Sequence, residues 1–158
     1  MMKNSILINA EGLENYSGEL NEVIEQTINK VLVAEGFDKS VEVSVLLVHS
    51  DEIKRLNKEY RGKDAPTDVL SFPTSEEDFE VDLATGRTIL GDIVLCTDVA
   101  LKQAEEIGNT LSEEIRFLTI HSMLHLLFYD HETSKEDEKE MFSRQQEILE
   151  FIKENKEN

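Results

Sequence analysis

The stretch TLSEEIRFLTIHSMLHLL, residues 110–127, decides the fold. Thr110 and Glu113 form a capping-box pair, in which each side chain bonds the other residue's backbone N–H, so a helix is predicted to begin here. Apolar residues then cover almost the whole circumference of that helix. They are Ile115, Phe117, Leu118, Ile120, Met123, Leu124, Leu126 and Leu127. A helix that is apolar all round must be buried, so the rest of the chain is expected to pack around it.

The chain on either side of this helix carries signals for both strands and helices. Residues 41–48 alternate between β-branched apolar and other side chains, as half-buried strands do. Three further segments are expected to be strands: residues 6–9, 68–72 and 88–96. Apolar residues at helical spacing over residues 17–35, before Gly36, predict a helix. Helices are also expected at three further cap residues, Ser50, Thr97 and Thr133.

These elements predict an α+β fold in a single domain over residues 1–158. The domain is expected to hold a mixed sheet of about four strands packed against several helices, with the buried helix in the middle. The length suffices for one substantial core. No segment is apolar over a length that could cross a bilayer. A single cysteine, Cys96, excludes an internal disulfide framework, so the expected location is the cytoplasm, with no membrane partner.

The net charge, taken alone, argues against nucleic acid as a partner. Sixteen basic residues stand against thirty-four acidic ones, a balance of −18 that would repel a polyanion. The charge is uneven, however, because basic residues gather between positions 54 and 63. They are Lys54, Arg55, Lys58, Arg61 and Lys63. This cluster is either a surface for RNA or an ordinary solvated helix face.

Three histidines, His121, His125 and His131, follow one another at spacings of four and six residues. The first two project from one face of the buried helix, because residues four apart share a face. His131 lies beyond the expected end of the helix and can meet the other two if the chain turns back. Three neutral imidazoles suit one Zn²⁺ ion, and no obvious fourth protein ligand competes with catalytic water. The central helix is therefore expected to carry two metal-ligand histidines.

Three alternatives compete with a catalytic zinc site. Chance spacing would bury several unpaired imidazoles, at about 1–3 kcal/mol for each unsatisfied group. A structural zinc site commonly uses thiolates, and only Cys96 could supply one, from an apolar strand where an inert, buried cysteine is expected. Metzincin peptidases share the ligand spacing but carry a glutamate directly after the first histidine, where this chain has Ser122. The residues therefore favour a catalytic zinc site over chance spacing and over structural zinc, and they disfavour a peptidase.

Three blocks of this sequence occur together in a known family, in the same order and spacing. Residues 121–131, HSMLHLLFYDH, are similar to H-G-x-L-H-L-x-G-Y-D-H. Residues 56–73, LNKEYRGKDAPTDVLSFP, are similar to L-N-x-x-x-R-x-x-D-x-P-T-D-V-L-S-F-P, and residues 90–96, LGDIVLC, to L-G-D-I-x-I-C. The chain thus resembles the bacterial endoribonuclease and rRNA maturation factor family YbeY over nearly its whole length.

Two residues depart from the glycines of the family pattern. Ser122 is readily accommodated in a helix. Phe128 stands where the backbone is expected to turn towards His131 with a positive φ, which costs a bulky residue about 1–2 kcal/mol.

The resemblance implies a zinc-dependent endoribonuclease that cuts single-stranded RNA, in maturation of the 16S rRNA 3′ end and in ribosome quality control. The implied partners are rRNA and the ribosomal small subunit or its assembly proteins. His121, His125 and His131 would hold the one zinc ion. Arg61 would stabilise the charge that develops on the phosphate, so the catalytic residues would be Arg61, His121 and His125.

Three further residues, Asp68, Ser71 and Asp130, are candidates for binding substrate or for supporting the metal ligands. Metal-bound water and the RNA 2′-hydroxyl are both possible nucleophiles. Two other functions stay open. One is a non-catalytic, zinc-stabilised ribosome-assembly factor, because an acidic surface would attract basic ribosomal proteins. The other is a zinc hydrolase of another phosphoester or an amide.

Overall fold

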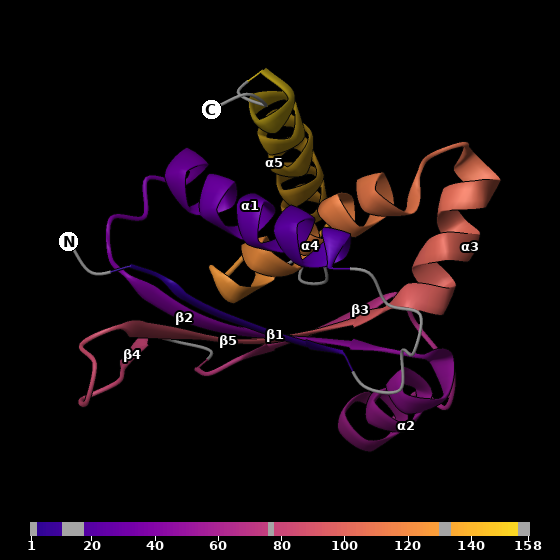
Figure 1. The fold of residues 1–158 in the computed structure, drawn as a ribbon, viewed down its shortest axis with the longest axis horizontal. Coiled ribbons are helices and arrows are strands. Elements are labelled where there is room, and N and C mark those ends of the chain that lie inside the picture. Colours follow the sequence, from indigo (N-terminus) through magenta and orange to yellow (C-terminus); the bar gives the residue numbers. More distant parts are fainter. Residues whose placement is uncertain (1–2, 11–17, 76–77, 130–133, 155–158) are drawn as a thin grey trace.

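The computed structural model describes residues 3–10, 18–75, 78–129 and 134–154. Within these ranges the expected strands and helices are present, with ends that differ by one or two residues from the prediction. In chain order (Figure 1) they are β1 (Ser5–Ala10), α1 (Glu19–Ala34), β2 (Val41–Val48), α2 (Ser50–Arg61), β3 (Val69–Pro73), β4 (Glu80–Val81), β5 (Thr88–Cys96), α3 (Thr97–Ile107), α4 (Leu111–Leu126) and α5 (Lys135–Glu154).

One mixed sheet holds the strands together. The strand order is β1-β2-β5-β3, and β4 pairs with β5 outside this row. Strands β1, β2 and β5 run parallel, whereas β3 and β4 are antiparallel to β5. The α+β class and the mixed sheet are therefore confirmed, with the two-residue β4 as an addition between β3 and β5. None of the described helices is both long and apolar enough to span a membrane.

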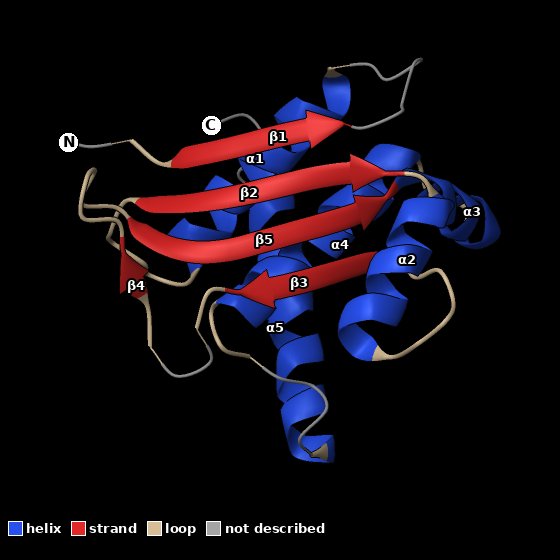
Figure 2. Cartoon of the chain, turned by 90° about the horizontal axis from the view of Figure 1, so that it is seen from below, coloured by secondary structure: helices blue, strands red, loops and turns tan. Residues whose placement is uncertain are grey.

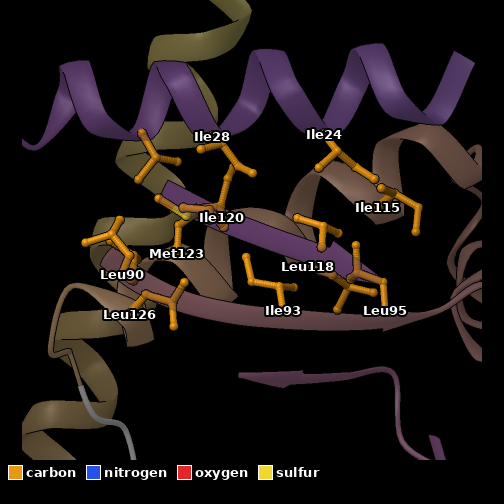
Figure 3. Close-up of a cluster of buried hydrophobic side chains, with 14 of the residues drawn as sticks. Ile24, Ile28, Leu90, Ile93, Leu95, Ile115, Leu118, Ile120, Met123 and Leu126 are labelled. Carbon is orange, nitrogen blue, oxygen red and sulfur yellow. The ribbon is translucent and has the colours of Figure 1, made fainter. Parts of the chain in front are cut away.

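The helices are divided unequally between the two faces of the sheet. Helices α1, α4 and α5 cover one face, and α2 packs on the other, near the carboxyl ends of β2 and β5 (Figure 1, Figure 2). The larger core lies between the sheet and the three helices, where side chains of α1, α4 and β5 meet (Figure 3). Ile115, Ile120 and Met123 of α4 are fully buried, which confirms that this helix lies in the middle of the fold.

The start of α4 has the predicted capping box. The backbone N–H of Glu113 donates to the Thr110 hydroxyl over 3.1 Å, and the backbone N–H of Thr110 donates to the Glu113 carboxylate over 2.9 Å. The predicted cap Thr133 lies outside the described ranges.

The predicted caps Ser50 and Thr97 were wrong by one position. Each is the first residue inside its helix, and the N-cap residues are His49 and Cys96. A residue distant in sequence supplies the cap of α2 instead. The carboxylate of Asp98, in the first turn of α3, accepts hydrogen bonds from the backbone N–H and the hydroxyl of Ser50, over 3.0 and 3.1 Å. Tertiary contact between the two helix starts thus replaces local capping.

Gly91 allows β5 to sit close to β3 at a bulge. The β2–β5 register passes from Ile89 to Gly91, so Leu90 is an extra residue in the ladder. Gly91 has a φ of 140°, and a Cβ placed there would lie 2.2 Å from the carbonyl oxygen of Phe72. A side chain at this position would therefore push β5 away from β3.

We expect Gly91→Ala to destabilise the fold by more than about 2 kcal/mol, because the substitution combines backbone strain with a clash against the main chain. Urea unfolding measures the loss. Gly18→Ala is the control, since Gly18 has a φ of −65° and open space around it. Its effect should stay below about 1 kcal/mol. Equal effects of the two substitutions would contradict the close-approach explanation.

Candidate active site

His121 and His125 project from one face of α4 towards each other. Their Nε2 atoms lie 3.2 Å apart, and their ring centroids lie 4.7 Å apart with the ring planes at 74°. Two imidazole nitrogens bound to one tetrahedral zinc at about 2.0–2.1 Å lie about 3.3–3.4 Å apart. The distance and the chemistry of the two donor atoms thus fit two ligands of one ion.

The side chain of Gln145, from α5, sets the tautomer of His121. Its carbonyl oxygen lies 3.0 Å from His121 Nδ1, and because this oxygen can only accept, Nδ1 carries the proton. A neutral His121 ring then presents a lone pair at Nε2, which is the form that binds a metal. Sequence reasoning missed Gln145. Its signal in the sequence is a polar residue at a position of the apolar stripe of α5, between Met141 and Ile148. In the structure the side chain is only 4% exposed.

A cavity of about 190 Å³ opens beside the two imidazoles. It is lined by residues of α2, of the loop that follows, of β3 and of α4. Arg61, Asp68 and Ser71, which the sequence singled out, line it together with His121 and His125. The fold thus gathers at one cavity five of the seven predicted site residues, which come from three separate parts of the chain.

The loop after α2 brings Arg61 and Asp68 to this cavity. Arg61 is the exposed last residue of α2, and Gly62 ends the helix with a φ of 70°. The buried Asn57 amide donates to the carbonyl of Ala65 over 2.8 Å, which fixes the loop against the helix. The Asp68 carboxylate accepts the backbone N–H of Val69 over 2.8 Å. Asp68 therefore shapes the start of β3 while it lines the cavity.

Ser71 bonds the serine that replaces a family glycine. The hydroxyl oxygens of Ser71 on β3 and Ser122 on α4 lie 2.6 Å apart. Ser122 is fully buried, so this bond satisfies a hydroxyl that would otherwise lose its hydration without compensation. The bond also ties the helix that carries the histidines to the strand that carries Ser71.

Phe128 makes the turn after α4 in the conformation that glycine usually adopts. Its φ is 75°, and its backbone N–H donates to the carbonyl of His125 over 3.0 Å. The N–H of Tyr129 donates to Leu124 over 2.9 Å, which completes a Schellman motif. The Phe128 ring stacks on Phe79, with the ring centroids 4.5 Å apart and the planes at 23°. This stacking offsets part of the steric cost of the turn.

Tyr129 fixes the chain immediately before the third predicted ligand. Its hydroxyl donates to one carboxylate oxygen of Glu35 over 3.2 Å, and Arg144 donates to the other over 2.7 Å. Burial and the Glu35 carboxylate raise the pKa of Tyr129, so the phenol keeps its proton as a donor. His131 and Asp130 lie outside the described residues. Within those residues no group of three histidine, cysteine, aspartate or glutamate side chains is arranged to hold a metal.

Cys96 is buried, as the sequence predicted. It belongs to the small core between α2 and the sheet, together with Val48, Ile53, Leu70 and Val94. Burial raises the pKa of its thiol, which disfavours the thiolate that a metal would need.

A double-mutant cycle on Phe79 and Phe128 tests the aromatic support of the turn. Phe79→Ala and Phe128→Ala should show a coupling of about 0.5–1.5 kcal/mol in urea unfolding, because each ring loses its stacking partner. Phe128→Gly should be about 1 kcal/mol more stable than Phe128→Ala, since only glycine adopts this φ without strain. A more stable alanine variant would contradict the left-handed turn.

Comparison with known proteins identifies the family of this chain. A sequence model of the family endoribonuclease YbeY matches residues 7–153. Similar relatives, each described as endoribonuclease YbeY, include one from Bacillus licheniformis, 49% identical over 80% of this chain and 81% of the relative. Another, from Sulfurihydrogenibium sp., is 44% identical over 95% of this chain and 93% of the relative.

A solved structure is also similar. The solution structure of a Thermotoga maritima protein is 38% identical, with a TM-score of 0.62 over 92% of this chain and 87% of that chain. The family model matches nearly the whole chain, and these two relatives are more than 40% identical to it. The chain therefore belongs to the endoribonuclease YbeY family of hydrolytic nucleases.

Proposed function

We propose that this protein is a zinc-dependent endoribonuclease that cuts single-stranded RNA and matures the 3′ end of 16S rRNA. One observation carries the proposal: the two Nε2 atoms of His121 and His125, 3.2 Å apart, open onto the same cavity as Arg61. A metal-ligand pair facing a guanidinium suits a phosphodiester, since the two groups can act on one phosphate from two sides. Membership of an endoribonuclease family supports RNA as the substrate.

His121, His125 and His131 would hold one zinc ion, with the fourth position left to water or substrate. Zinc bound there supplies a Lewis acid and lowers the pKa of a water that it binds. Gln145 keeps His121 in the ligand tautomer through Nδ1. Either a water molecule or the RNA 2′-hydroxyl would be the nucleophile at phosphorus, and the P–O bond to the departing nucleoside would break as that oxygen takes up a proton.

The remaining predicted residues would act on the substrate or on the loop. Arg61 would bind two phosphate oxygens with its planar guanidinium and stabilise the negative charge of the transition state. Ser71 and Asp68 line the cavity within reach of a bound strand. Asp130, next to His131, would support that ligand.

Although the net charge is −18, basic residues gather along α2 and near the cavity. Lys54, Lys58 and Arg61 recur four and three residues apart along α2 and are exposed, and Lys63 follows at the cavity. Arg55 lies on the same helix and pairs with Glu52 and Glu59. The exposed basic row would attract RNA at short range, where a local field outweighs distant charge at physiological salt.

A second function has one observation in its favour. The strongly acidic remainder of the surface would attract basic ribosomal proteins, which suits a zinc-stabilised assembly factor of the small subunit that performs no catalysis. We place both functions in the cytoplasm. An Arg61→Ala protein that still supports full ribosome maturation would favour assembly over cleavage. A zinc hydrolase of other esters or amides would leave RNA intact in a substrate panel.

Removal of either histidine should abolish both metal binding and cleavage. We expect His121→Ala and His125→Ala to lose the bound zinc, measured by metal analysis, and to lose cutting of a single-stranded oligoribonucleotide. His49→Ala is the matched control, because His49 pairs with Asp98 at the start of α2, away from the cavity. If the protein still cut the oligoribonucleotide after chelation and dialysis had removed the zinc, the proposal would be wrong.

Substitution of Arg61 should separate catalysis from metal binding. We expect Arg61→Ala to keep its zinc and lower kcat by about 10²–10³-fold, as loss of one transition-state contact does. Arg55→Ala on the same helix should leave kcat within about twofold, because surface ion pairs of this kind contribute little. Equal losses in the two variants would indicate a general charge effect instead.

A further inference from the structure

A second and larger hollow lies on another side of His121. It has a volume of about 810 Å³ and runs between α4 and the first half of α5. His121 lines both this hollow and the smaller cavity that contains Arg61, so the two meet at the same imidazole. Helix α5 extends past the β3 edge of the sheet (Figure 2). We call it the α4/α5 groove.

The groove combines aromatic rings with positive charge. Phe117 lies one helical turn before His121 on α4, and Lys135, Lys139 and Phe142 follow one another at helical spacing on α5. Phe142 is 58% exposed, which is unusual for a phenylalanine. Aromatic side chains beside lysines are the common means of binding single-stranded nucleic acid, because bases stack on the rings and phosphates lie by the ammonium groups.

The charge of the groove differs from that of the surface around it. Two lysines and one acid, Glu138, line it, whereas Glu136, Asp137 and Glu140 of the same helix do not. The lining is thus net positive in a chain of net charge −18. A volume of this size also suits a nucleotide, since pockets for small ligands measure about 300–1,000 Å³.

We propose that the α4/α5 groove binds a nucleotide of the RNA strand next to the scissile phosphate, with its base on Phe142 and a phosphate near Lys139. This inference rests on the proposed function, because it takes the RNA to be held at His121. The strand would then cross the histidine pair, with the Arg61 cavity on one side and the groove on the other. The groove thereby supplies the contact by which the enzyme selects an unpaired strand, since a base inside a duplex cannot stack on a ring.

The test uses metal-free, full-length protein and a single-stranded oligoribonucleotide that contains 2-aminopurine, whose fluorescence changes when it stacks. Phe142→Ala should weaken binding by about 5- to 150-fold and abolish the fluorescence change. Phe142→Tyr should keep both. The matched control is Leu101→Ala, which removes an exposed apolar side chain of α3.

A second pair of variants tests the phosphate contact. Lys139→Gln should lower the slope of log affinity against log salt by about 0.7, the value for one contact to a single strand. Lys102→Gln, on α3, should leave the slope unchanged. If Phe142→Ala left the binding affinity, the fluorescence change and KM unchanged, the proposed nucleotide site in the groove would be wrong. Cleavage of RNA by the wild type would still support the proposed function. An effect of Phe142→Ala on self-association alone would likewise overturn it, in favour of a second copy.

The opposite combination of results also separates the two proposals. Should the zinc-loaded wild type fail to cut RNA while Phe142→Ala still loses binding, the proposed activity fails and the groove stands as a nucleotide site. Metal-free binding and zinc-dependent cutting therefore report on the two proposals separately.

Discussion

Helix α4 is packed between the sheet on one side and α1 and α5 on the other, with α3 against its first turns. This burial positions the parts of the candidate site that α4 carries or contacts. It sets His121 and His125 beside the first residues of β3, aligns Ser122 with Ser71, and brings the Nδ1 atom of His121 to Gln145. Because packed cores are dense and tolerate little displacement, the packing around α4 restrains the distances between these atoms.

The polar atoms of α4 carry a cost that their partners offset. A buried polar group without a partner costs about 1–3 kcal/mol, and α4 carries the buried Ser122 hydroxyl and two partly buried imidazoles. Ser71 and Gln145 provide partners for two of these groups. At the other end of the helix, stacking on Phe79 offsets the strain of Phe128. The site thus depends on neighbours from three other elements, namely β3, the loop before β4 and α5.

Local signals in the sequence predicted the elements well and their connections poorly. The capping box at Thr110 and the apolar circumference of α4 are local features, and both predictions were confirmed. Ser50 failed as a cap because Asp98, 48 residues later, bonds the start of α2, and the Thr97 hydroxyl donates instead to the carbonyl of Val48. Phe79 acts through a contact across the fold that no local pattern encodes, and the polar Gln145 in the apolar stripe of α5 does not reveal that its partner is His121. Arg61, Asp68 and Ser71 could be grouped with the histidines only through the family resemblance, since spacing alone does not bring them together.

The central claim is that imidazole nitrogens alone, with solvent, hold the zinc ion. Zinc K-edge X-ray absorption of the loaded protein tests it directly, because scatterers at different distances are resolved. We expect the zinc ion to have three nitrogen ligands and one oxygen ligand at about 2.0–2.2 Å. In His131→Ala we expect one imidazole ligand fewer. A sulfur ligand at about 2.3 Å, or an unchanged spectrum in His131→Ala, would contradict it.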